Sequence, residues 1–196
     1  MMLPFYKMMG AGNDFVMVDN RDLSLTAVLT HDNIADICNR RFGVGADGLI
    51  VAEQPCAAGA LRMRLYNSAG EEQPVCGSAA LSFAAFADLL LEGELPQIPF
   101  EIGEEVPVGC LNEDDSVSVL CSAPLGERMS ILLGGAPTLP EYAGKESPIS
   151  LELSGGEVLH MAYERQPDGS SGDVTLTGNV LVVFRGELIL YSEEEC

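Results

Sequence analysis

The sequence predicts an α+β protein in which many short strands accompany one completely buried helix. Between positions 79 and 91 only Ser82 and Asp88 are polar, so the helix expected there is apolar on every face. Such a helix is buried on all sides. From about residue 98 onward, short apolar runs alternate with turns rich in Gly, Asp, Ser and Pro, which indicates an all-β segment. A chain of 196 residues can form one large core or two small lobes.

The first part of the chain combines short strands with one amphipathic helix. The segment 10–13, Gly-Ala-Gly-Asn, predicts a tight turn between the first two strands, and its backbone can approach a ligand closely. Thr30 or Asp32 can cap the following helix. One face of that helix is expected to be buried, with Ile34, Ile37, Cys38 and Phe42. The predicted elements are strands over 3–9, 14–19, 49–51 and 61–66 and a helix over 33–42.

The second part reads as strands with one long interruption. Strands are predicted near 98–102, 106–111, 116–121, 129–133, 149–153, 157–163, 173–177 and 180–190. The segment 134–148 has the weakest pattern and is the best candidate for a linker, and the tail Ser-Glu-Glu-Glu-Cys is expected to fray. The hairpins beginning at Glu105 and Glu157 follow a similar plan, a faint internal repeat.

The charge balance is strongly acidic and excludes some partner classes. The chain carries 10 Lys and Arg against 30 Asp and Glu, a formal net charge of −20. Phosphate backbones are bound by clusters of Lys and Arg, and the sequence contains none. Neither nucleic acid nor an anionic membrane is therefore an expected partner, and the acidic surface is read as a solubilising one.

Cysteine usage and the absence of a leader segment favour a cytoplasmic protein with reduced thiols. The six cysteines, at positions 38, 56, 76, 110, 121 and 196, form no Cys-x-x-Cys pair. Cys38 is expected in the core, because a free cysteine packs as a small hydrophobe. His31 is expected to face solvent near a helix start, whereas His160 lies in a predicted strand whose alternation leaves its orientation open. No metal cluster and no Ser-His-Asp arrangement is predicted.

Cys76 is the strongest candidate for chemistry because it immediately precedes the apolar helix. A helix N-terminus favours a thiolate, and its free N–H groups can hold a carboxylate and developing negative charge. The Gly77 that follows would let a carboxylate approach the backbone. The alternative is an inert cysteine beside a buried helix. Asn13 and Asn67, each close to glycines, are by composition alone turn formers.

Five segments resemble the diaminopimelate epimerase family. The opening FYKMMGAGNDFVMVD, the segment RRFGVGADGLI and the segment YNSAGEEQPVCGSAA resemble its strand–turn–strand, its second signature and the region of its first catalytic cysteine. Near the end, SGGEVLHMAY and DVTLTGNVLVVFRGEL resemble the last strands of the family. The first two segments are long and specific, and they identify the chain as a member even without the third.

The resemblance implies a fold, a reaction and a set of site residues. It implies one near-complete lobe over 1–125, in which a small β-barrel wraps around a central helix, a linker over 126–148, and remnant strands of a second pseudo-symmetric lobe over 149–192. It implies cofactor-free, PLP-independent epimerisation of an amino acid, LL- to meso-diaminopimelate in lysine biosynthesis, with no metal. Cys76 is then a catalytic acid/base. The implied substrate contacts are Asn13, Asn67, Gly77 and Ser78.

Two differences from the family pattern leave the activity open. Ser78 and Ala79 stand where the family has Asn and Gly, and Ala69-Gly70 replaces its Asp-Gly. The second central helix and the second catalytic cysteine have no counterpart, although racemisation needs an acid/base on each face of Cα. A homodimer could supply a second Cys76. The alternative is a catalytically inactive homologue that acts as a ligand- or partner-binding module.

Overall fold

The computed structural model describes residues 2–57, 59–121, 147–152, 156–165 and 171–190. Over these ranges the chain forms two helices and twelve strands. In chain order they are β1 (Met2–Gly10), β2 (Asn13–Asp19), α1 (His31–Cys38), β3 (Gly48–Glu53), β4 (Leu61–Asn67), β5 (Glu72–Gln73), α2 (Gly77–Leu90), β6 (Ile98–Glu101), β7 (Val108–Leu111), β8 (Val117–Cys121), β9 (Ile149–Glu152), β10 (Val158–Arg165), β11 (Ser171–Gly178) and β12 (Val180–Ile189).

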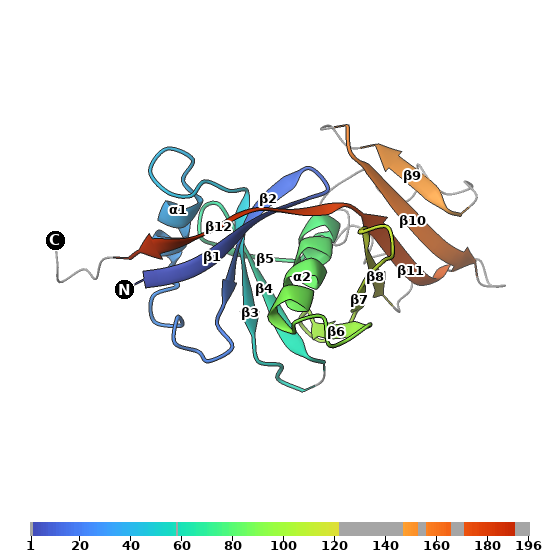
Figure 1. Cartoon of the computed structure of the whole chain (residues 1–196), viewed down its shortest axis with the longest axis horizontal. Coiled ribbons are helices and arrows are strands. Elements are labelled where there is room, and N and C mark those ends of the chain that lie inside the picture. Colours follow the sequence, from blue (N-terminus) through green and yellow to red (C-terminus); the bar gives the residue numbers. More distant parts are fainter. Residues whose placement is uncertain (1, 58, 122–146, 153–155, 166–170, 191–196) are drawn as a thin grey trace.

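The strands form one sheet that curves around α2 but does not close. Its order is β12-β1-β2-β3-β4-β6-β7-β8-β11-β10-β9, and β5 pairs with β4 beside this path. Neighbours are antiparallel except for β2 with β3 and β4 with β6. The last strand returns to pair with the first, so the two ends of the described chain lie together (Figure 1). The predicted α+β class with strands wrapped around a central helix is confirmed, with an open sheet in place of a closed barrel.

The main core surrounds α2. The helix packs against strands from both parts of the chain, including β1, β8 and β11, and Figure 1 shows it enclosed in the curve of the sheet. Leu81, Phe83 and Ala84 have no exposed surface, and Phe86 has almost none. The fully apolar segment in the sequence is therefore buried as predicted, except at its end, where Leu89 is 44% exposed.

A second, smaller core lies between α1 and the other face of β1, β2 and β3. Thr30 caps α1 by accepting a hydrogen bond from the backbone N–H of Asn33, as one of the two predicted caps. Ile34, Ile37 and Cys38 are buried in this core. Burial raises the pKa of the Cys38 thiol to about 11, which is the behaviour of a structural cysteine.

The helix predicted over 33–42 is shorter at its end than expected. It ends at Cys38, and the side-chain oxygen of Asn39 accepts hydrogen bonds from the N–H groups of Arg41 and Phe42. Asn competes with helical hydrogen bonds in this way and favours turns. The turn directs Phe42 into solvent, where it is 91% exposed. The prediction that Phe42 lies on the buried face is wrong for this reason.

Most predicted strands of the second part are present within a few residues of their expected bounds. The strand predicted at 129–133, the tail, and the linker predicted over 126–148, apart from Ser147 and Pro148, lie outside the described residues. Strand β11 pairs directly with β8, so the sheet of the first part continues into β9–β11. The division into a first lobe and a remnant of a second one stays a prediction.

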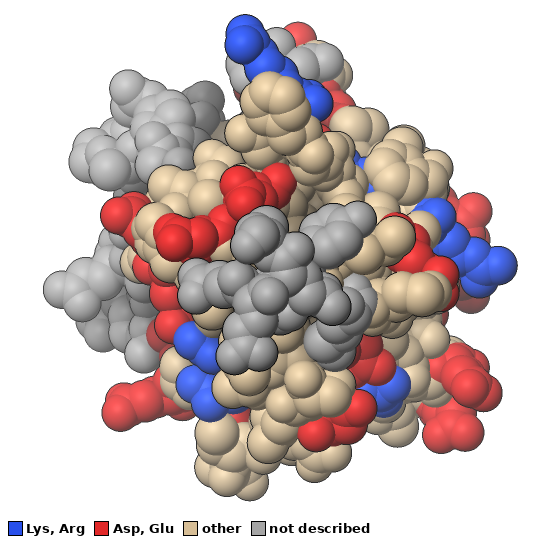
Figure 2. Space-filling view, turned by 90° about the vertical axis from the view of Figure 1, so that its left-hand side faces the viewer, with Lys and Arg blue, Asp and Glu red and all other residues tan. Residues whose placement is uncertain are grey.

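Acidic side chains are spread over the surface, while basic ones stand apart from one another on the face drawn in Figure 2. Within the described ranges, no group of His, Cys, Asp and Glu could hold a metal ion. Neither helix of the described part is long and apolar enough to cross a bilayer. The described cysteines, which exclude Cys196, are all free thiols.

Candidate active site

The start of α2 presents a thiol and a set of free backbone donors. Cys76 is the residue before the helix, in extended conformation with φ −100° and ψ 165°, and its side chain makes no cap hydrogen bond. Its carbonyl accepts the first helical bond, from Ala80 N–H at 2.9 Å. The N–H groups in the first turn of α2, before Ala80, have no acceptor within the helix. This end of the helix therefore carries partial positive charge. The helix starts at Gly77, so Cys76 directly precedes it, as expected from the sequence.

A short polar chain links the glycine-rich turn between β1 and β2 to the Cys76 thiol. The amide of Asn13 donates to the Ser78 hydroxyl oxygen at 2.8 Å, and that oxygen lies 3.3 Å from the Cys76 sulfur. Because Asn13 occupies a lone pair of the hydroxyl oxygen, the hydroxyl proton is free to point at the sulfur. The turn that places Asn13 here has positive φ angles, 50° at Ala11 and 80° at Gly12.

This arrangement suits proton transfer beside a bound carboxylate. A half-buried thiol at a helix N-terminus can give or accept a proton, and the Ser78 hydroxyl lies within hydrogen-bond distance of its sulfur. The first N–H groups of α2 offer donors for a carboxylate and for charge that develops next to it. Gly77, the first residue of α2, is buried and carries no side chain that could stand between a ligand and the helix start.

Asn67 is engaged in its own turn. Its side-chain oxygen accepts hydrogen bonds from the N–H groups of Ala69 and Glu71, both at 3.0 Å, and its amide donates to the Glu71 carboxylate at 3.0 Å. These bonds shape the turn between β4 and β5, in which Gly70 has a φ of 88°. The structure thus brings Asn13, Gly77 and Ser78 to Cys76, and it gives Asn67 the bonds of a turn former.

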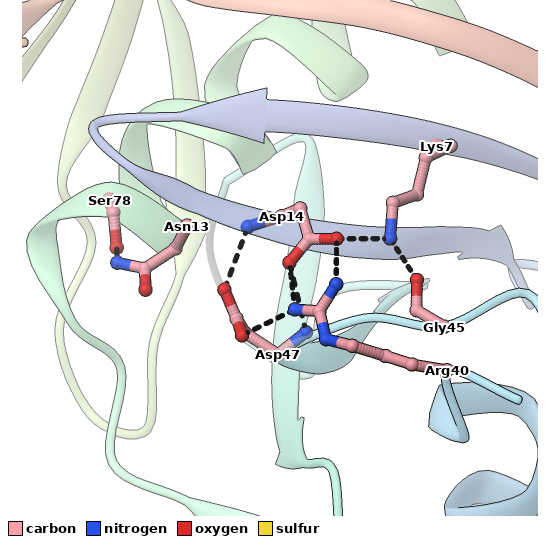
Figure 3. A network of polar contacts seen from close by, with 7 residues as sticks. All are labelled: Lys7, Asn13, Asp14, Arg40, Gly45, Asp47 and Ser78. Carbon is pink, nitrogen blue, oxygen red and sulfur yellow. Dashed lines mark hydrogen bonds and ion pairs between the residues drawn. The ribbon is translucent and has the colours of Figure 1, made fainter. Parts of the chain in front are cut away.

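An ion network lies beside the site and joins strands β1 and β2 to the loop over 40–47 (Figure 3). Asp14 is the centre of the network: its carboxylate contacts Lys7 Nζ at 2.6 Å and both terminal nitrogens of Arg40 at 3.0 and 2.6 Å. Lys7 also donates to the Gly45 carbonyl. Asp47 accepts from Arg40 at 2.7 Å and from the Asp14 N–H at 3.1 Å. The network fixes the strand that carries Asn13 to the loop over 40–47.

The network strongly favours the ionised form of Asp14. Burial opposes ionisation, but hydrogen bonds donated by Arg40, by Lys7 and by the backbone N–H of Asp47 outweigh it and hold the pKa of Asp14 well below its usual range. The hydrogen bonds that Arg40 donates to Asp14 and Asp47 raise the pKa of Arg40. The Lys7 side chain is only 7% exposed, so this carboxylate is the negative charge that faces its ammonium group. Asp14 and Asp47 therefore serve as hydrogen-bonding residues between these segments.

A pH titration should reveal this network as an acid-sensitive part of the stability. A group whose pKa is depressed by folding stabilises the protein above its unfolded pKa, about 4 for Asp, and loses that contribution as the pH falls toward the folded value. We expect the difference in unfolding free energy between the natural protein and Asp14→Ala to be constant from neutral pH down to about 5. Below about 4 it should shrink. Urea unfolding at a series of pH values measures it, and a difference that grows on acidification contradicts the assignment.

Sequence reasoning missed Lys7 and Arg40 as members of a network. The sequence did contain a signal for Lys7. It follows Leu3 and Phe5 at every second position of the strand, so its side chain lies on the same buried face. Arg40 offered no comparable signal, since its partners are distant in sequence. His31 is exposed as predicted and contacts the Asp32 carboxylate. His160, whose orientation the sequence left open, is also exposed and contacts Ser150.

Comparison with known proteins places these features in one family. The family model described as diaminopimelate epimerase matches residues 5–117. The diaminopimelate epimerase of Picosynechococcus sp. is 32% identical over 155 residues, covering 79% of this chain and 54% of its own. That of Prochlorococcus marinus is 36% identical over 149 residues, covering 71% and 48%. The chain spans about half the length of these curated relatives.

Solved structures with the same fold have little sequence similarity to the chain. A phenazine biosynthesis protein of the PhzF family from Bacillus anthracis has a TM-score of 0.64 at 11% identity, covering 97% of this chain and all of its own. A hydroxyproline epimerase from Agrobacterium vitis has a TM-score of 0.60 at 8% identity, covering 98% and 94%. At such identities the likeness concerns the fold alone, a sheet wrapped around a buried helix.

Proposed function

Because the chain belongs to the diaminopimelate epimerase family, we propose that it exchanges the Cα proton of an amino acid, with Cys76 as an acid/base. The relatives' names make LL- and meso-diaminopimelate, lysine and peptidoglycan precursors, the first substrates to test. The reaction needs no cofactor: the thiolate takes the proton from Cα, and the electron pair is delocalised into the substrate carboxylate.

One observation carries the proposal, namely the joint placement of Cys76, the Ser78 hydroxyl and the start of α2. A substrate carboxylate seated on the first N–H groups of the helix would place its Cα next to the sulfur. The negative charge that develops on the carboxylate during proton removal would then face the positive end of the helix dipole. The Ser78 hydroxyl, oriented by Asn13, would stabilise the thiolate before the transfer.

Inversion at Cα needs a second acid/base on the opposite face. We expect a chain with one such thiol to exchange the proton from one face, and to invert the centre only if a second group is supplied. A second copy of Cys76 in a homodimer is one source. Proton exchange without inversion and exchange with inversion are therefore separate predictions for the same site.

The test is an exchange experiment in deuterium oxide with LL- and meso-diaminopimelate, glutamate and proline. Loss of the Cα proton signal in NMR should depend on the protein and fall by about 100-fold or more in Cys76→Ser, because general acid/base groups contribute on that order. Cys38→Ser is the matched control, since Cys38 is buried and far from solvent. Absence of exchange with every substrate at high protein concentration would refute the proposal.

A second candidate is a catalytically inactive module that binds a ligand or partner. It is favoured by the side chains of Asn13 and Asn67, which already have hydrogen-bond partners inside the chain. This candidate predicts that an amino acid shifts the amide resonances of Gly77 and Ser78 without proton exchange, and that Cys76→Ser binds as well as the natural protein. Binding accompanied by exchange that requires Cys76 decides for the enzyme.

A further inference from the structure

Gly10, the last residue of β1, is a contact between the glycine-rich turn and helix α2. It is buried, and it lies opposite Asn13 in the pairing of β1 with β2. Side chains of opposed residues in an antiparallel pair lie on the same face of the sheet. A side chain at position 10 would therefore lie on the face of the Asn13 side chain, which points at Ser78 at the start of α2 (Figure 3).

The structure leaves no room for a side chain at position 10. A Cβ atom built on Gly10 would overlap the Ser82 hydroxyl oxygen and would lie 3.4 Å from the Ser78 carbonyl oxygen and 3.4 Å from a methyl group of Val180. Close-packed interiors respond to a single added methyl group by shifts of the backbone. If the Ser82 hydroxyl turned aside, the added methyl group would still press on the helix backbone at Ser78.

Ser82 provides a second observation at the same contact. It has no exposed surface, and its hydroxyl has no hydrogen-bond partner in the described structure, an arrangement that costs stability. Ser78 and Ser82 are four residues apart in α2, so they lie one above the other on the same face of the helix. The turn meets this face twice, with the Asn13 amide at Ser78 and with Gly10 at Ser82.

We propose that Gly10 is a positioning residue for the candidate site. The absence of a side chain there lets the turn lie against α2 at Ser82, and this contact holds Asn13 on the Ser78 hydroxyl beside Cys76. A substituent at position 10 moves the turn away from the helix and separates Asn13 from Ser78. The inference deepens the proposed function, because it names what holds the polar chain at Cys76, but the contact is measured without substrate.

Gly10→Ala tests the proposal by adding a single methyl group. In NMR spectra we expect the nuclear Overhauser effect between the Asn13 side-chain amide protons and the Ser78 Hβ protons to be lost. The double variant Gly10→Ala, Ser82→Gly removes the helix side chain that the methyl group would overlap, so the signal should return. Ser82→Gly alone should keep the signal. Glycine inside a helix lowers stability, so a return of the signal in the double variant reports the local contact and not a gain in overall stability.

Gly103→Ala is the matched control for a loss of stability alone. Gly103 has a φ of 61°, so alanine strains its backbone, but a Cβ there meets no atom within 4 Å. Its stability should fall while the signal between Asn13 and Ser78 persists. Far-ultraviolet circular dichroism of each variant checks that the fold is retained.

The outcomes separate this inference from the proposed function. Loss of the signal in Gly10→Ala and its return in the double variant support the inference, whether or not Cα protons exchange, and so does a Gly10→Ala chain that fails to fold beside a double variant that folds. Where exchange occurs, its rate should fall about tenfold or more in Gly10→Ala and recover in the double variant, because misplaced groups lose rate.

Four results would overturn the inference. They are absence of the signal from the natural protein, an unchanged signal in Gly10→Ala, a loss that persists in the double variant, and an equal loss in Gly103→Ala. Absence of Cα exchange from every variant, with the signal lost and recovered as expected, refutes the proposed function alone.

Discussion

Replacement of Asp14 by alanine is expected to lower the free energy of unfolding by about 3 kcal/mol, the cost of leaving a buried charge without its partner. Asp14 holds two cations, and one of them, Lys7, is only 7% exposed. Without the carboxylate, Lys7 keeps its hydrogen bond to the Gly45 carbonyl but loses its ion-pair partner. Urea unfolding followed by circular dichroism measures the change as a lower midpoint at constant slope.

Two further variants distinguish the stability cost of an unpaired buried charge from the cost of losing an ion-pair contact. In Lys7→Met with Asp14→Ala, no buried charge remains and the apolar side chain fills the space, so we expect much of the lost stability to return. Asp19→Ala is the matched control, because Asp19 also pairs with an arginine, Arg21 at 2.8 Å, but both side chains are about one third exposed. Its loss should stay below about 1 kcal/mol. An equal loss in both alanine variants would contradict the argument.

The two helices show what can and cannot be predicted from the sequence. The buried helix was predictable because Leu81, Phe83 and Phe86 belong to a segment that is apolar on every face, and burial follows directly from that composition. The end of α1 was not, because the Asn39 side chain turns the chain before Phe42 can join the buried face. Hydrophobic periodicity does not register such a local hydrogen bond.

The candidate site was only partly predictable for a similar reason. Cys76 was identified by its position before an apolar helix, and the resemblance to a family added Asn13 and Ser78. Neither source predicted that Asn13 would donate to Ser78, or that Asp14 would join Lys7 to Arg40, because these contacts join segments far apart in the sequence. Pairing partners of this kind depend on the register of β1 with β2 and on the path of the loop after α1.

Replacement of Phe83 by alanine is expected to cost about 4 kcal/mol of unfolding free energy, the loss typical of a buried aromatic side chain. Phe83 has no exposed surface, and its ring packs against that of Phe100 with centroids 5.0 Å apart. The sheet curves around α2 at this point, so the surrounding strands are fixed by their own hydrogen bonds and cannot collapse into the space. The penalty therefore includes the cavity as well as the lost contacts.

The same helix provides the control for this prediction. Leu89→Ala removes an apolar side chain from the last turn of α2, where Leu89 is 44% exposed, and should cost about 1 kcal/mol or less. Helix propensity is equal or better in both variants, because alanine is the best helix former. A difference between them therefore measures burial at the centre of the fold, by urea midpoint at constant slope. Equal losses of stability in Phe83→Ala and Leu89→Ala would contradict a core centred on α2. The position of Cys76 at the start of that helix would then need another explanation.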